Sequence, residues 1–180
     1  MTGRARAAVV LLALAPPLAG ACENVVGYEW VDPPISLGDT AGADAPGAPP
    51  HVELGFYAEL GYRALEDGDP CPIVYGLQGG TWVMPAVRTT GLGGYPRVAC
   101  HLDTAAGERV GDAVTQVRLY LATDGALEVQ SFPIAIHHAP PRQDEDVDDL
   151  GGEPATLTCD LDDLAGNSAS AAVDVVLVAP

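Results

Sequence analysis

Three cysteines are the residues of this 180-residue chain whose spacing points most directly to a reaction: Cys71, Cys100 and Cys159. Two of them lie in matching segments, VACHLDTAAGE (98–108) and LTCDLDDLAGN (157–167), which share the spacing C-x-L-D-x-x-A-G. In each segment the cysteine falls on the apolar face of an alternating strand pattern. We therefore predict a Cys100–Cys159 disulfide, with Cys71–Cys100 as the alternative. No C-x-x-C and no paired Cys/His spacing supports a zinc site.

Carboxylates gather in two short segments that could hold a cation. The run DEDVDD (144–149) packs five carboxylates into six residues, and carboxylate oxygens are the ligands that calcium prefers. The ordered D-x-D-x-D-G spacing of a hand-type calcium loop is missing. We expect an acidic solvated loop, and keep calcium as an alternative. The calcium candidates are Asp144, Asp146 and Asp148, with Asp160, Asp162 and Asp163 as a second oxygen cluster.

Catalytic motifs are absent from the sequence. There is no G-x-S-x-G elbow, no phosphate-binding glycine loop and no H-E-x-x-H. His137 and His138 are adjacent, so on a strand their rings would point to opposite faces and would not share a metal. We predict that the protein is not an enzyme and has no cofactor. The alternative is an envelope hydrolase that uses an unrecognised pair of carboxylates.

Alternating apolar residues predict the elements that position these side chains. In VELGFYAELGYRA (52–64) every even-numbered residue is apolar, which is the pattern of a half-buried strand. Similar short runs follow, separated by Gly, Pro, Asp and Asn, and no window holds a helical stripe. The sequence predicts a single all-β domain over residues 51–180, a β-sandwich of seven to nine strands. The strand runs begin at residues 71, 81, 97, 113, 126, 155 and 170.

The front of the chain has the features of an export signal. Arg4 and Arg6 precede an unbroken apolar run (7–15), and small residues follow it. The run is too short to span a membrane, which takes about 20 residues. We predict that residues 1–21 are a signal peptide.

The residues LAGAC (18–22) resemble the lipobox of bacterial lipoproteins, in which small residues directly precede a cysteine. The leucine lies one residue further forward than is usual for that family. The resemblance implies that Cys22 becomes the lipid-carrying N-terminus and anchors the protein in a bacterial membrane. The alternative is cleavage after Ala19-Gly20-Ala21 and plain secretion. If Cys22 carries lipid, three cysteines remain that can form disulfides. If Cys22 is unmodified, four remain and two disulfides are possible.

The segment after Cys22 has the composition of a tether. Residues 22–50 are rich in Pro, Gly and Ala and cannot bury enough apolar surface to offset their ordering entropy. Tyr28 and Trp30 are exceptions, with side chains suited to a membrane interface or to docking on the folded domain. We therefore predict a lipid-anchored flexible tether between the signal peptide and the sandwich.

Two segments of the domain resemble those of known families. The second cysteine segment, running into SASAAVDVVLV (168–178), resembles the last hairpin of bacterial immunoglobulin-like domains, where a D-x-x-G-N turn joins the final two strands. The resemblance implies that the predicted sandwich is immunoglobulin-like. The segment GLQGGTW (76–82) is similar to a G-x-Q-G-G-x-aromatic segment of uncharacterised exported bacterial proteins. We expect it to be a structural turn with Trp82 in the core. The alternative is a ligand loop that exposes Gln78 and Trp82.

The net charge of −17 restricts the partners. Removal of residues 1–21 leaves 25 Asp and Glu against six Arg. Nucleic-acid binding depends on basic residues that neutralise phosphates, so we predict no nucleic-acid partner. The expected partners are a membrane, through the lipid anchor, and a protein or glycan ligand. Together these features predict a cell-envelope protein with a binding or structural role.

Overall fold

The computed structural model describes residues 49–58, 61–76, 79–138 and 146–179. Within these ranges the chain forms strands and one short 3-10 helix, η1 (Val147–Leu150). In this described part, no helix has the length and apolar character needed to cross a membrane. The all-β prediction is confirmed.

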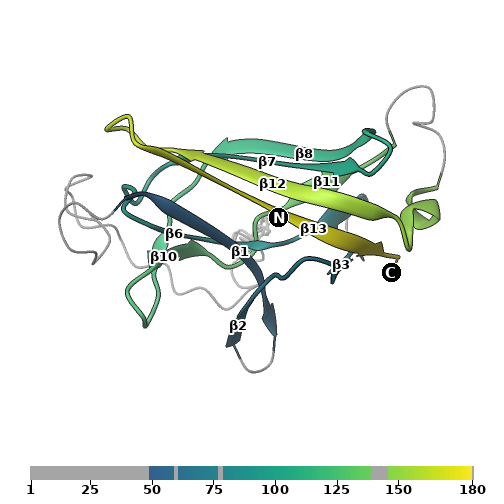
Figure 1. Cartoon of the computed structure of the whole chain (residues 1–180), viewed down its shortest axis with the longest axis horizontal. Helices are drawn as coiled ribbons and strands as arrows, with labels where there is room; N and C mark the ends of the chain where they lie inside the picture. The colour runs from purple at the N-terminus through teal and green to yellow at the C-terminus, as the bar shows by residue number, and fades with distance from the viewer. Residues whose placement is uncertain (1–48, 59–60, 77–78, 139–145, 180) are drawn as a thin grey trace, which may run out of the picture. The chain divides into compact units, whose positions relative to one another are not determined.

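The strands form two sheets (Figure 1). In spatial order, the five-stranded sheet contains β2 (Gly61–Ala64), β1 (His51–Ala58), β6 (Ala86–Thr90), β10 (Leu127–Val129) and β9 (Tyr120–Leu121). The eight-stranded sheet contains β3 (Asp69–Pro72), β13 (Ser168–Val178), β12 (Pro154–Asp162), β7 (Arg97–Thr104), β8 (Arg109–Gln116), β11 (Ile134–Ile136), β5 (Thr81–Val83) and β4 (Val74–Tyr75). Neighbouring strands pair antiparallel, except that β3 pairs parallel with β13.

Apolar side chains from both sheets share one core, as a sandwich requires. Val52 and Leu54 of β1 and Val87 of β6 belong to the same buried cluster as the inward residues of β7 and β12. Along β7 and β12 burial alternates strictly, so every second side chain enters the core. This pattern is the one that the sequence predicted for residues 97–102 and 155–161.

The strand count exceeds the predicted seven to nine because several predicted runs divide into two strands, and three of these runs change sheets. AVTQVRLYL contains the end of β8 in the eight-stranded sheet and all of β9 in the five-stranded sheet. TWVMPAVR becomes β5 in the eight-stranded sheet and β6 in the five-stranded sheet, with Pro85 between them. ALEVQSFPIAIH likewise divides into β10 and β11, which lie in different sheets. Proline cannot donate to a ladder, so TWVMPAVR and ALEVQSFPIAIH each break near their proline and turn from one sheet to the other.

The prediction of one continuous strand over residues 52–64 is wrong. β1 ends at Ala58, and β2 pairs antiparallel with it so that Tyr57 lies opposite Tyr62. Gly61 adopts φ of 110°, a conformation that favours glycine, so the chain can reverse there. The alternation of apolar residues continues through the hairpin, and sequence pattern alone therefore does not reveal the reversal.

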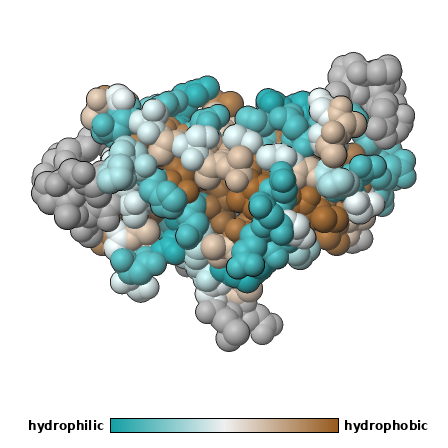
Figure 2. Space-filling model, in the orientation of Figure 1, coloured by the Kyte–Doolittle hydropathy of each residue, from teal (hydrophilic) through white to brown (hydrophobic). Residues whose placement is uncertain are grey.

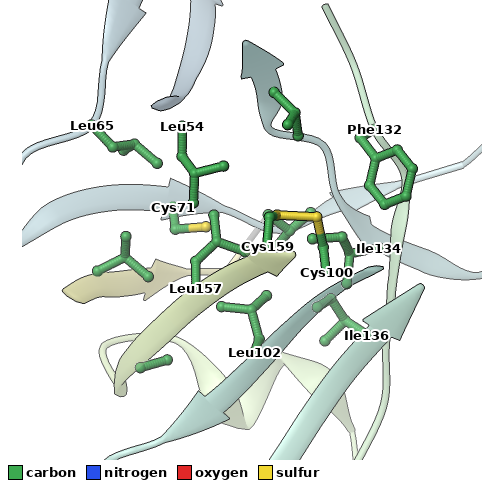
Figure 3. Packing of buried hydrophobic residues seen from close by; sticks show 14 of the residues in the cluster. Leu54, Leu65, Cys71, Cys100, Leu102, Phe132, Ile134, Ile136, Leu157 and Cys159 are labelled. Atoms are coloured by element: carbon green, nitrogen blue, oxygen red, sulfur yellow. A yellow bond between two sulfur atoms is a disulfide. The ribbon is translucent and has the colours of Figure 1, made fainter. Parts of the chain in front are cut away.

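Cys100 and Cys159 form a disulfide across directly paired residues of β7 and β12, as predicted. Both half-cystines are buried in the centre of the core, next to Leu102 and Leu157 (Figure 3). Cys71 is buried and is a free thiol. Burial raises the pKa of the Cys71 thiol to about 12, so this thiol stays protonated and unreactive at neutral pH.

Asp163 organises the turn between β12 and β13. Its Oδ1 accepts hydrogen bonds from the backbone N–H groups of Ala165 and Asn167, each at 2.9 Å. Its Oδ2 accepts from Asn167 Nδ2 at 2.9 Å and from the Gly93 N–H at 3.1 Å. The D-x-x-G-N segment is therefore a turn held by one carboxylate, so Asp163 has a structural role.

Replacing Asp163 with alanine should lower the free energy of unfolding by about 2 kcal/mol at pH 7, because hydrogen bonds to a charged group are lost. Partial burial opposes ionisation of Asp163, but the hydrogen bonds from Asn167, Gly93 and Ala165 prevail and lower its pKa. A lowered pKa stabilises the fold above the unfolded value of about 3.9, and this stabilisation disappears as the pH falls through the folded value. Urea unfolding at pH 7 and at pH 3 should therefore show a smaller difference between wild type and Asp163→Ala at pH 3. An equal difference at both pH values would contradict this role.

Candidate functional site

The outer face of the five-stranded sheet carries a cluster of charged and aromatic side chains centred on Arg88. In the strand register Arg88 of β6 lies directly opposite Glu53 of β1 on one side and Glu128 of β10 on the other. Side chains directly opposite one another on neighbouring strands share a face, so the three form a row across the sheet. The Arg88 side chain is 11 % exposed and the Glu128 side chain only 4 % exposed.

Three carboxylates surround the Arg88 guanidinium. Its Nη2 donates to both carboxylate oxygens of Asp124, at 2.5 Å each. Its Nε lies 3.2 Å from Glu128 Oε2 without hydrogen-bond geometry, and its Nη1 lies 4.0 Å from Glu53 Oε1. Hydrogen bonds from Arg88 and from the Ala126 N–H lower the pKa of Asp124, so this carboxyl stays ionised. One guanidinium therefore lies close to three carboxyl groups, so acidic groups outnumber basic groups in the cluster.

Two tyrosines complete the cluster. The Tyr57 hydroxyl donates to Glu128 Oε1 at 2.5 Å, and Gln130 Nε2 donates to the same oxygen at 3.0 Å. The Arg88 guanidinium carbon lies 4.3 Å from the centroid of the Tyr62 ring, which is a cation–π contact. Partial burial and the hydrogen bond to Glu128 raise the pKa of Tyr57 to about 12. Burial and the Glu53 carboxylate raise the pKa of Tyr62 above its usual value, so both phenols remain neutral.

Gly55 makes room for the Tyr62 ring. A Cβ atom at this position would lie 2.5 Å from Tyr62 Cε2 and would also contact the carbonyl oxygen of Arg63. The ring therefore lies against the bare backbone of Gly55, where it also contacts Arg88. A glycine in the middle of a strand lacks a side chain to pack, and here the tyrosine ring covers it.

Changing Gly55 to alanine should displace Tyr62 and lower the free energy of unfolding by about 2 kcal/mol, since the added methyl overpacks a filled space. The NMR signals of the Tyr62 ring and the urea midpoint would report the displacement and the loss of stability. Gly107 is a control, because no atom lies within 4 Å of a Cβ built there. Its positive φ still adds strain, so Gly107→Ala should cost about 1 kcal/mol. A larger loss at Gly107 than at Gly55 would contradict this packing.

A surface hollow of about 130 Å³ lies beside Arg88. Its walls offer carboxylates from Glu53 and Asp124, the guanidinium of Arg88 and the hydroxyl of Thr90. The hollow therefore offers hydrogen-bond donors and acceptors to a small polar group. The full set of lining residues is His51, Glu53, Arg88, Thr89, Thr90, Asp124 and Ala126.

The arrangement favours binding over hydrolysis. A glycosidase needs one carboxyl kept protonated to act as the acid, opposite a second carboxylate. Here Arg88 lies between the carboxylates, and it lowers the pKa of Asp124. Glu128 is buried beneath Tyr57 and Gln130 and does not line the hollow.

The described residues of the GLQGGTW segment, 76 and 79–82, pack around the Trp82 ring. Trp82 is half-buried on β5, and its ring occupies the space where side chains on Gly76 and Gly80 would stand. Gly79 and Gly80 have φ of 84° and 91°, so the turn requires glycine there. The turn thus covers the Trp82 ring, but the expectation that Trp82 lies in the core is wrong, because its neighbour Val83 is the residue of β5 that enters the core. Gln78 lies outside the described residues.

The acidic run begins a short helix. Asp146 is the N-cap of η1, and its Oδ1 accepts from the Asp148 N–H at 3.2 Å. Asp148 Oδ1 accepts from the Tyr75 hydroxyl at 2.6 Å. Asp144 lies outside the described residues, so the calcium alternative stays a prediction. In the ranges that the structure describes, no group of three or more His, Cys, Asp or Glu side chains is placed to hold a metal ion.

The two adjacent histidines have different environments. His137 is exposed, whereas the His138 side chain is fully buried. His138 Nε2 lies 3.2 Å from the carbonyl oxygen of Asp146, and its Nδ1 lies 3.5 Å from Glu108 Oε1. Asp160 and Asp162 project from β12, and Asp162 pairs with Arg97 at 3.5 Å. These residues do not join the Arg88 cluster.

The sequence did not predict the Arg88 cluster. Its members come from β1, β2, β6, β10 and the turn before β10, and their meeting depends on strand order. One signal was available: Arg88, Glu128 and Glu53 are charged residues inside apolar strand runs. A charge within such a run must find a partner across the sheet.

Comparisons with known proteins include a likeness to a solved structure. No family model matches the chain, and no curated protein matches it in sequence. The fold is similar to the CooA pilin subunit from enterotoxigenic Escherichia coli, with a TM-score of 0.37 and 11 % identity over 72 % of this chain and 98 % of that chain. A TM-score of this size carries no argument about function. Cys22 and the predicted signal peptide and tether lie outside the described residues.

Proposed function

We propose that the chain is an exported cell-envelope protein, anchored in a bacterial membrane by lipid on Cys22, whose β-sandwich has a binding role. The signal-like residues 1–21, the small residues before Cys22 and the tether composition of 22–50 support export and anchoring. The buried Cys100–Cys159 disulfide adds support, because disulfides persist in oxidising compartments outside the cytoplasm.

The Arg88 cluster is the observation that carries the binding role. Stability alone gives little reason to hold Arg88 and Glu128 in a sheet, since replacing a buried ion pair by apolar residues is often neutral or stabilising. The adjoining hollow presents acceptors from Glu53 and Asp124 and donors from Arg88 and Thr90. The hydroxyl groups of a neutral ligand such as a glycan can donate hydrogen bonds to the two carboxylates and accept hydrogen bonds from Arg88 and Thr90.

Binding to oligosaccharides tests this role. Residues 22–180 with Cys22→Ser would be titrated by NMR with a panel of neutral oligosaccharides and peptidoglycan fragments. We expect shifts at His51, Thr90 and Ala126 with at least one member of the panel. Glu53→Gln should weaken this binding by about tenfold, because a charged acceptor is lost. Asp162→Asn, on the other sheet, is the control. Absence of binding across the panel, or equal weakening by both variants, would overturn the glycan proposal.

A further inference from the structure

Strand β13 is only partly covered on its outer edge. On its inner edge it pairs with β12 from Ser168 to Val176, but on its outer edge it pairs with β3 only over Val175–Val178. Between Ser168 and Val173, no strand in the described ranges pairs with the outer edge. Six consecutive residues of β13, Ser168 to Val173, therefore form an open edge of the eight-stranded sheet in the described part of the chain.

Backbone hydrogen bonds show which residues face this open edge. Asp174 accepts from the Gly68 N–H at 2.8 Å, and Val178 accepts from the Ile73 N–H at 2.8 Å, both on the β3 side. Leu177 bonds instead to the segment before β12. Successive residues of a strand alternate in direction, so even-numbered residues face outward. The N–H and C=O groups of Ser168, Ser170 and Ala172 consequently point away from β12.

The open edge adjoins an apolar seam between the two sheets. Ala169, Ala171 and Val173 point toward the core but are only half-buried, whereas Leu157, Cys159 and Leu161, opposite them on β12, are fully buried. The facing strand is β1, which lies close to β13. Figure 2 shows hydrophobic residues gathered at the middle of this face, in the region of β1 and β13. One more strand at this place would complete the burial of these side chains.

The open stretch of β13 lacks the features that protect other edges of the sheets. β3 contains Pro70 and Pro72, β2 carries Arg63, and β4 and β9 are two residues long. Prolines, charges and short strands are the common means by which proteins prevent strand addition. Residues 168–173 (SASAAV) contain no proline and no charge. The contrast indicates that this edge is suited to accept a strand.

We propose that an extended, basic segment of a partner protein adds to the Ser168–Val173 edge of β13, with apolar side chains in the seam and Lys or Arg side chains outside. Charge favours such an occupant. Asp67 and Asp174 stand at one end of the edge, where Asp67 accepts from the Asp174 N–H at 3.2 Å. Asp160 and Asp162 lie beside Ser170 and Ser168 on the next strand. A second copy of this chain brings the same acidic surplus, so it is repelled.

Hydrogen exchange with a defined peptide tests the proposal. The probe is an acetylated, amidated octapeptide of alternating Val and Lys, added to residues 22–180 carrying Cys22→Ser. We expect the amide exchange of Ser168, Ser170 and Ala172 to slow by about tenfold or more at saturation, as added backbone hydrogen bonds protect these groups. Ala172→Pro, which removes one outward N–H and leaves the bonds to β12, should weaken the binding.

Two matched peptides keep the test independent of whether the proline variant folds. Val/Glu alternation should bind at least about tenfold more weakly, because it adds like charge. N-methylation of alternate amides should abolish binding, because it removes the donors that β-addition uses. Equal binding of the N-methylated peptide, or no change in exchange with Val/Lys, would overturn the proposal. Slow amide exchange of these residues without any peptide would also overturn it. Protection that does not depend on protein concentration would indicate that residues of the same chain cover the edge, and protection that grows with concentration would indicate a second copy.

Discussion

Replacing Cys100 and Cys159 together with alanine should lower the free energy of unfolding by about 4 kcal/mol. The disulfide closes a loop with a sequence separation of 59 residues, and a cross-link over that length restricts the unfolded chain by about this amount. Both cysteines are also buried in the core, so their replacement by alanine removes packing contacts as well as the covalent bond. Urea unfolding of the oxidised protein, followed by circular dichroism, would measure the difference.

Cys71→Ala is the matched control for the disulfide. It removes a buried sulfur from the same core and breaks no covalent bond, so it should cost about 1 kcal/mol. Reduction of wild-type protein should reproduce most of the loss seen in the double variant. A double variant that costs no more than twice the Cys71→Ala loss would show that the disulfide contributes nothing beyond packing.

Replacing Arg88 with alanine should lower the free energy of unfolding by about 3 to 4 kcal/mol. The Glu128 side chain is 4 % exposed and would lose the guanidinium that lies 3.2 Å from it. A buried charge left without its partner is strongly destabilising. The cation–π contact with Tyr62 and the bonds to Asp124 would disappear as well. Thermal and urea unfolding at pH 7 would measure the loss.

Arg97→Ala and a rescue variant separate the buried pair from ordinary surface charge. Arg97 pairs with Asp162 at 3.5 Å, with both side chains about half exposed. Exposed ion pairs contribute about 0 to 1 kcal/mol, so Arg97→Ala should be nearly neutral. Adding Glu128→Gln to Arg88→Ala should recover part of the loss, because the buried charge is gone. Equal effects of Arg88→Ala and Arg97→Ala, or no recovery, would contradict the role given to Glu128.

Local alternation made most of the fold predictable. Residues 97–102 and 155–161 alternate cleanly, and this pattern placed Cys100 and Cys159 on inward faces before their pairing was known. The D-x-x-G-N turn was also predictable, since Asp, Gly and Asn each suit a tight turn for their own physical reasons. In both cases the information lies within about ten residues of chain.

Strand order could not be predicted from such local patterns. β1 and β2 share one uninterrupted alternation, and only Gly61 marks the reversal between them. Strands β5 and β6 come from one apolar run of the sequence but belong to different sheets. The Arg88 cluster depends on these long-range pairings, because Glu53, Arg88 and Glu128 are brought together by the order β1-β6-β10. The sequence around each of these residues does not indicate which distant residues it will contact.

The intact mass of the mature protein is the most direct test of the central claim that this β-sandwich works outside the cytoplasm on a lipid anchor. The whole chain from Met1 would be expressed in a bacterial host, extracted from membranes and measured with and without reduction, beside a Cys22→Ala variant. We predict a product that begins at Cys22, carries acyl chains there and contains one disulfide, with the variant missing from the membrane fraction. A cytosolic product still beginning at Met1, or an unacylated Cys22 joined in a second disulfide, would contradict the account.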